Sequence, residues 1–239
     1  MKILLPGCSE NSAICVALTR LGLNAVCADE DSAHDLLNGN ADELGGFSAV
    51  FFSGEFVTRS EDCKNAVKAL CKRCREMEIP VIFDPDSKRI SSQKERETIC
   101  EIAALSEIFL PAVEDIKALC GLDEPEKIAE HFLGIGARKV VVTLDKKGAF
   151  YKSAKESGYA PTFRADKVVD TEGAGSAFAA GLISGITEEI PLSEAVIRAN
   201  ACGCIAIQSQ GELDGLPTMD ALREYMLDHR FAVEGCKEF

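Results

Sequence analysis

Short apolar runs alternate with amphipathic segments along the first 150 residues. The runs are nearly free of polar residues, which is typical of strands buried on both faces, and they lie at 2–6, 23–27, 48–54, 79–84, 106–111 and 138–144. The segments between them repeat apolar residues at helical spacing, at 11–22, 61–77, 94–106, 114–122 and 126–136. This alternation predicts an α/β fold with a central, mostly parallel sheet and helices on both faces.

The pattern changes in the last third of the chain. Residues 149–163 read as a hairpin, and small or apolar residues at helical spacing predict two helices over 174–186 and 192–209. Two valines before the first of these helices suggest a strand that ends at Val169. Because no repeat or low-complexity linker interrupts the chain, we expect residues 1–239 to form a single domain.

Composition and charge narrow the classes of partner. The chain has 239 residues, of which 46% are hydrophobic, so it can bury a substantial core. Lys and Arg number 26 against 39 Asp and Glu, which gives a net charge of −13. Such an acidic chain is a poor match for nucleic acid, which needs clustered basic residues, and for anionic membranes. No apolar run reaches the length of a membrane span.

The eleven cysteines are scattered and lie mostly within apolar runs, as Cys15 and Cys204 do. Reduced cysteine behaves in this way, as a small hydrophobic residue. The spacing gives no paired zinc-binding units, so we expect a reduced protein in the cytoplasm.

The segment 168–186 is the strongest chemical signal. A turn of small residues, Gly173, Ala174 and Gly175, precedes a helix expected to start around Ser176. Small residues let a ligand approach the backbone, and the start of a helix offers unpaired N–H groups and a positive dipole end. These features together would bind a phosphate. The alternative is a plain turn in which Ser176 caps the helix.

Several spaced motifs resemble those of the ribokinase-like (PfkB) carbohydrate kinases, in the order of that family. DTEGAGS at 170–176 is similar to the family's D-T-x-G-A-G-D, and VVVTLDKKGAF to its T-x-G-x-x-G. IFLPAVED is similar to P-N-x-x-E, VIFDPDSK to D-P-N-x-R, and PGCSEN to G-G-x-x-x-N. The resemblance covers most of the chain and implies phosphoryl transfer from ATP with Mg²⁺, and K⁺ as a further cation, to a small hydroxylated molecule.

The resemblance also implies a role for each matching position. The anion hole would be Gly173, Ala174 and Gly175, followed by Ser176 at the position of the catalytic base. The nucleotide would lie against Thr143, Asp145, Gly148, Asn200 and Gly211. The acceptor would lie against Gly7, Asn11 and Asp84. Asp115 would serve Mg²⁺, and Asp170 and Glu172 a monovalent cation.

The departures from the family pattern bear on activity. Ser176 replaces the family's general base, and a serine hydroxyl is not basic near neutral pH. Losing a positioned base costs about 10²–10⁴-fold in rate. Other family positions hold different residues here, namely Ala112 for Asn, Asp115 for Glu, Asp145 for Gly, Asp86 for Asn and Lys88 for Arg. Glu172, in the same loop, is a speculative substitute base.

The acceptor side is shortened relative to the family. About twenty residues separate Cys27 from Ser48, which leaves little room for the family's small β-sheet lid, and no Asp precedes Gly7 in the sequence given. We therefore expect the lid to be lacking or vestigial. The sequence leaves the identity of the acceptor open. It also leaves open whether the protein forms a homodimer, which the family often builds through its lid.

Two alternatives to a weakened sugar kinase remain. The first is a non-catalytic pseudokinase that binds a nucleotide or phosphate. The second, a dinucleotide-binding protein, is disfavoured because G-x-G-x-x-G does not follow the first predicted strand.

Overall fold

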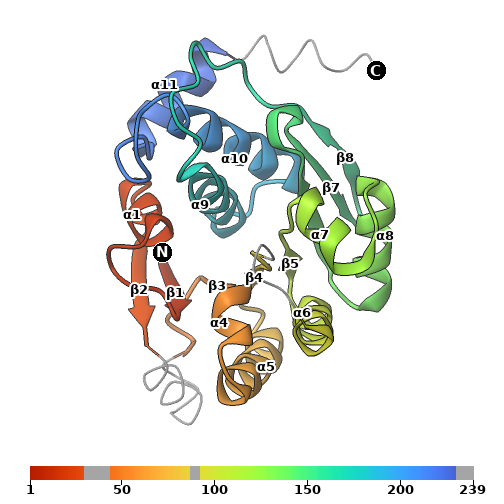
Figure 1. Ribbon diagram of the computed structural model, residues 1–239. Helices are drawn as coiled ribbons and strands as arrows, with labels where there is room; N and C mark the ends of the chain where they lie inside the picture. Colours follow the sequence, from red (N-terminus) through yellow and green to blue (C-terminus); the bar gives the residue numbers. More distant parts are fainter. Residues whose placement is uncertain (30–43, 87–91, 230–239) are drawn as a thin grey trace.

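One eight-stranded sheet organises the molecule (Figure 1). The computed structural model describes residues 1–29, 44–86 and 92–229. The strands are β1 (Lys2–Pro6), β2 (Asn24–Ala28), β3 (Ala49–Ser53), β4 (Val81–Asp84), β5 (Ile108–Phe109), β6 (Lys139–Thr143), β7 (Ala149–Ser153) and β8 (Ser157–Ala160), in the spatial order β2-β1-β3-β4-β5-β6-β7-β8. β1 to β6 are parallel, and β7 and β8 are added antiparallel as a hairpin.

Helices cover both faces of this sheet. One face carries α1 (Ala13–Arg20), α9 (Ala174–Thr187), α10 (Leu192–Ala206) and α11 (Met219–Asp228). The other carries α4 (Gly54–Thr58), α5 (Glu61–Glu76), α6 (Gln93–Leu105), α7 (Val113–Cys120) and α8 (Pro125–Ile135). The mostly parallel α/β architecture predicted from the sequence is therefore confirmed.

The core explains why the central strands are continuously apolar. On the α4–α8 face, Phe52, Phe83 and Phe109 come from three neighbouring strands, and their ring centroids are 5.3 and 5.7 Å apart. Phe132 of α8 continues the row, 4.3 Å from Phe109. All four rings are fully buried, and each contributes about 1.5–3 kcal/mol by burial.

The expectation of a strand that ends at Val169 is wrong. Val168 and Val169 are exposed by 65% and 45%, and they lie in an irregular segment. The Val169 N–H donates to Ile207 O at 2.8 Å, so the chain docks on the end of α10 rather than on a strand. Sequence reasoning also missed α4 and α11.

The described residues bear on the lid in one respect. All strands within residues 1–29, 44–86 and 92–229 belong to the one sheet, and 30–43, where a lid segment would begin, lie outside the description. Lys88 also lies outside the described residues, and the single domain over 1–239 stays a prediction. In the ranges described, no helix combines the length and apolar character that crossing a membrane requires.

Candidate functional site

The predicted site residues come from loops that follow the strands at the carboxyl edge of the sheet. Gly7 follows β1, Asp84 ends β4 and Asp145 follows β6. The C-terminal end of α9 lies at the opposite edge, because Ile186 and Thr187 line a hollow there together with Ser48 at the start of β3. The N-terminus of α9 therefore points toward the carboxyl edge, where open α/β sheets bind ligands.

The two acceptor-side positions Gly7 and Asp84 lie in tight turns. Gly7 adopts φ +77° and its N–H donates to Ala28 O at 2.7 Å. A Cβ at Gly7 would come within 2.2 Å of the ring of Phe56, so only glycine fits between β1 and α4. Asp84 accepts from the Asp86 N–H at 3.0 Å, which folds the chain back just after β4.

Asn11 is exposed in the turn that leads into α1. Ser12 caps that helix and its Oγ donates to Ser9 O at 2.7 Å, which tightens the turn. β1 and β4 are both hydrogen-bonded to β3, so the structure brings Gly7 and Asp84 to one end of the sheet, with Asn11 beside Gly7 along the chain.

The turn predicted to bind phosphate leads into a helix that starts where the pattern over 174–186 predicts. α9 starts at Ala174, its N-cap is Gly173 in the left-handed region, and Ser176 is the third residue of the helix. The start near Ser176 that the motif suggested is two residues late, and the alternative that Ser176 caps the helix is wrong, because Gly173 can take the positive φ that ends the loop. The Ala174 N–H donates to Thr171 O at 3.4 Å, and the N–H groups of Gly175 and Ser176 lack acceptors within the helix ladder.

The first turn of α9 is open on one side. A Cβ added at Gly175 would meet no atom within 4 Å, whereas one at Gly173 would come within 2.3 Å of Glu212 O. The end of the loop at Gly173 thus packs against Glu212, whereas no atom obstructs the position beside Gly175 in the first turn of the helix. This arrangement fits an anion bound to the helix N-terminus.

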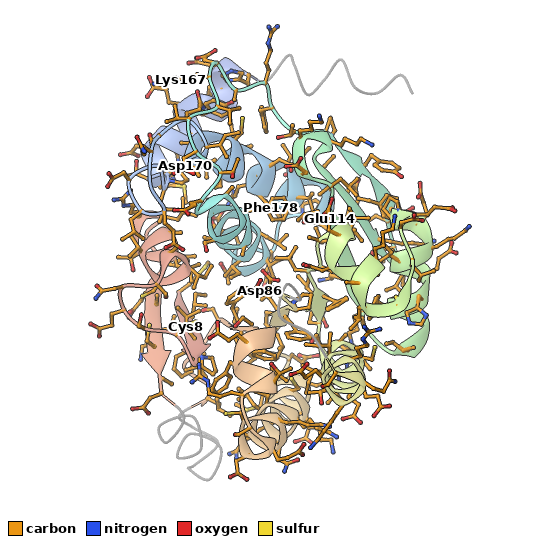
Figure 2. The ribbon with its side chains drawn as sticks, viewed as in Figure 1. Cys8, Asp86, Glu114, Lys167, Asp170 and Phe178 are labelled. Carbon is orange, nitrogen blue, oxygen red and sulfur yellow. The ribbon has the colours of Figure 1, made fainter. Side chains whose placement is uncertain are left out.

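Asp170 fastens this loop to the segment after α10. Its carboxylate accepts from the N–H of Glu172 at 3.1 Å and from the N–H of Gly211 at 2.9 Å. These two backbone hydrogen bonds lower the pKa of Asp170 below its ordinary value. Figure 2 shows Asp170 beside the start of α9, with Lys167 farther out along the same loop. We call this arrangement, Asp170 with the N–H groups of Glu172 and Gly211, the Asp170 clasp.

The nucleotide-side residues form a second wall. Thr143 forms a parallel bridge with Ala112, and its N–H donates to Pro111 O at 2.9 Å, so the two motifs that carry them lie side by side. Gly148, at φ +92°, has no room for a Cβ because Ala160 O would lie within 2.2 Å. Asn200 is buried and its Nδ2 donates to that same Ala160 O at 2.8 Å. Asn200 therefore positions the wall through the backbone of Ala160.

Asp115, proposed for Mg²⁺, and Asp145, expected beside the nucleotide, follow the neighbouring strands β5 and β6. Asp115 is buried in the first turn of α7, while Asp145 is exposed in a short 3-10 turn after β6, with φ +53°. Among the residues that the structure describes, no three His, Cys, Asp or Glu side chains gather into a metal-binding group. Mg²⁺ commonly uses one or two carboxylates together with substrate phosphates, so Asp115 still suits that role, and the roles of Asp170 and Glu172 stay predictions.

Two hollows of about 740 and 750 Å³ lie at the amino edge of the sheet, away from these residues. No predicted site residue lines either of them. Of the basic residues that line them, Arg138 and Lys139 are each paired with Glu107 at 3.2 Å, and Arg75 donates to Ala104 O and Leu105 O at 3.2 and 3.0 Å. We therefore place the functional site at the carboxyl edge, where the motifs meet.

Sequence reasoning missed two residues that shape this edge. Phe56 packs against Gly7, and Arg20 donates from α1 to backbone carbonyls 193 or more positions later in the chain. A regular helical pattern around Arg20 gives no signal of such a distant contact.

Comparisons with known proteins agree with this geometry. The family model described as pfkB family carbohydrate kinase matches residues 6–219. The chain is 40% identical over 133 residues to a 2-dehydro-3-deoxygluconokinase of Bacillus subtilis, covering 56% of this chain and 41% of that protein. It spans about half the length, or less, of the first curated relatives it matches.

Solved structures show the same fold. A protein assigned as ribokinase II from E. coli, in complex with ATP and Mg²⁺, matches with a TM-score of 0.75 and 17% identity, over 95% of this chain and 99% of that one. A fructokinase variant from Vibrio cholerae, with fructose, ADP and potassium ion bound, matches with a TM-score of 0.76 and 17% identity, over 94% and 97%.

Proposed function

Because the chain belongs to the pfkB family of carbohydrate kinases, we propose that it binds ATP and transfers its terminal phosphoryl group slowly to a sugar-type hydroxyl. The observation that carries the proposal is the first turn of α9, where Gly173 ends the loop at a positive φ, no side chain obstructs Gly175, and the N–H groups of Gly175 and Ser176 have no acceptor in the helix ladder. The names of the curated relatives are those of sugar and ribosyl kinases, which favours an acceptor with several hydroxyl groups.

The residues present suit a bound nucleotide. The backbone N–H groups of Gly175 and Ser176 would bind phosphoryl oxygens, and Thr143 and Gly148 would border the nucleotide along the wall held by Asn200. When bound, ATP with Mg²⁺ supplies the phosphoryl group and screens its charge, so the protein's main task is positioning and electrostatic stabilisation. Asp115 would help to hold Mg²⁺, and Asp170 and Glu172 the monovalent cation, K⁺.

Ser176 determines how fast the transfer would be. Its hydroxyl lies in the first turn of α9 but cannot take the acceptor's proton near neutral pH, whereas its N–H can still bind an anion. Binding should therefore be retained while turnover falls by about 10²–10⁴-fold relative to an enzyme with a base there. The same substitution favours the second candidate function, a pseudokinase that binds nucleotide without turnover.

Ser176→Asp distinguishes the two. Calorimetry with ATP and Mg²⁺ and a turnover assay over a panel of sugars and sugar acids should be run on wild type and variant. Tight binding with slow turnover that rises at least about 100-fold in Ser176→Asp would support the weakened kinase. Binding with no turnover in either protein would support the pseudokinase.

A matched control separates the position from the added charge. Ser157→Asp places the same change on an exposed residue of β8 and should leave turnover unaltered. Absence of nucleotide binding in wild type would contradict both functions. Wild-type turnover equal to that of Ser176→Asp would contradict the weakening attributed to serine.

The state of the cysteine thiols bears on the cellular compartment of the protein. All ten cysteines among the described residues are free, and several are fully buried, as Cys63 and Cys202 are. Free buried thiols suit a reducing compartment, so we place the protein in the cytoplasm with small-molecule ligands as its partners.

A further inference from the structure

Arg20, in the last turn of α1, reaches across to the loop that follows α10. Its Nη1 donates to Leu213 O at 2.9 Å and to Leu216 O at 2.8 Å, with Asp214 O at 3.3 Å. Three carbonyl oxygens of one short segment thus surround a single guanidinium nitrogen. Hydrogen bonds from a charged donor are stronger than those between neutral groups, so this contact fixes residues 213–216.

The same loop touches the phosphate-binding turn at its other end. Gly211 donates to Asp170 in the Asp170 clasp, and Glu212 O lies close enough to Gly173 to exclude any Cβ there. The N–H groups of Val169 and Asp170 donate to Ile207 O, at 2.8 and 3.3 Å. Residues 207–216 therefore lie between Arg20 and the start of α9.

The other end of α1 carries the acceptor side of the proposed site. Gly7 and Asn11 immediately precede this eight-residue helix, and Arg20 ends it. α1 also packs against α9 within one buried core. One helix thus joins the turn proposed to bind the acceptor to the loop that borders the phosphate-binding turn.

We propose that Arg20 is a positioning residue that fixes residues 207–216 and, through the Asp170 clasp, the turn at Gly173. The role of Arg20 in catalysis rests on the proposed function, whereas its positioning of residues 207–216 does not depend on that function. Without the guanidinium, the loop should detach at 213–216, and Gly211 and Glu212 should lose their fixed place against Asp170 and Gly173. Nucleotide affinity should fall, and acceptor affinity should change much less.

The test compares Arg20→Met, which keeps an apolar stem, with Arg20→Lys, which keeps a charged donor. Arg223→Met is the matched control, since Arg223 is 70% exposed and its ion pair with Asp220 is long, at 3.8 Å. Hydrogen exchange of the ligand-free proteins should be measured at the Gly211 and Glu172 amides. The affinity for ATP with Mg²⁺ should be measured by calorimetry.

We expect exchange at Gly211 and Glu172 to be about tenfold faster in Arg20→Met, partly restored in Arg20→Lys and unchanged in Arg223→Met. We expect the affinity for ATP to weaken about tenfold in Arg20→Met, to weaken less in Arg20→Lys and to be unchanged in Arg223→Met. Unchanged exchange at both amides in Arg20→Met would overturn the proposal. Faster exchange spread evenly over all helices would also overturn it, because Arg20 would then support only global stability.

The exchange and affinity measurements together distinguish a failure of this proposal from a failure of the proposed function. If wild type binds no nucleotide, the proposed function fails, and the exchange arm still decides whether Arg20 positions the turn. If wild type binds ATP and Arg20→Met binds it equally well with unchanged exchange, the proposed function stands and the role of Arg20 is refuted.

Discussion

A methyl group at Gly173 should disrupt the phosphate-binding turn, whereas the same methyl two residues later should not. Gly173 sits at φ +77°, and an added Cβ would come within 2.3 Å of Glu212 O and 3.1 Å of Glu212 C. Both of these atoms are backbone, so no side-chain rotation can relieve the contact. At Gly175, inside the first turn of α9, the same Cβ would meet no atom within 4 Å.

Two terms set the magnitude for Gly173→Ala. Placing an L-residue in the left-handed region costs about 1–2 kcal/mol. Crowding a packed site typically costs about 1–3 kcal/mol, because neighbouring backbone must shift. The free energy of unfolding should therefore fall by about 2–5 kcal/mol. Gly175→Ala should gain about 0.5–1 kcal/mol, since alanine is the better helix former and nothing obstructs it.

Urea unfolding followed by circular dichroism measures both values, and thermal melts give a second reading. One kcal/mol corresponds to about 2–4 °C for a chain of this size, so Gly173→Ala should melt about 4–20 °C lower. Phosphate or ATP affinity should fall in Gly173→Ala because the displaced residue is the N-cap of α9. Equal stability of the two variants would refute the packing of Glu212 against the turn.

Two further predictions test the edges of the site. Asp170→Asn should lower the free energy of unfolding, and the difference from wild type should be full above about pH 4 and shrink as pH falls. The pKa of Asp170 is lowered from 3.8, so acidification protonates the wild-type carboxylate and removes the charge that the variant lacks. Urea midpoints at several pH values measure this difference, and a difference independent of pH would contradict the reasoning. Gly7→Ala should cost about 2–5 kcal/mol, because Gly7 also lies in the left-handed region and Phe56, which is 2% exposed, cannot move its ring away. Phe56→Leu in the same chain should recover part of this loss, and simple additivity in a double-mutant cycle would disprove the contact.

The strands could be predicted because burial on both faces leaves a direct mark on the sequence. Phe52, Phe83 and Phe109 stand within continuous apolar runs, and their rings form one row in the core. The same reasoning failed at Val168 and Val169, since β-branched residues favour a strand only where a neighbouring strand is free to pair. Here the segment pairs with the end of α10 instead.

Local motifs indicated the candidate site, but contacts between distant segments were beyond prediction. DTEGAGS identified the turn, yet the start of α9 at Ala174 depends on the φ of Gly173 and on Glu212, about forty positions later. Asn200 was expected to border the nucleotide, and the fold shows its amide bound to Ala160 O. The contacts of Arg20 with residues 213–216 belong to the same class, since no periodicity in the sequence encodes them.

The charge of the carboxyl edge supports the cation requirement in the proposed function. Asp84 ends β4, Asp115 lies in the first turn of α7 and Asp145 lies in the turn after β6, all at this edge, on a chain with a net charge of −13. The phosphate-binding turn offers backbone N–H groups and no basic side chain, so it supplies partial positive charge only. A triphosphate brought to this edge would meet repulsion that partial charges do not fully offset, and bound cations restore the balance. If the proposed function holds, affinity for the nucleotide should depend on Mg²⁺ more than it would in a site lined by lysine or arginine.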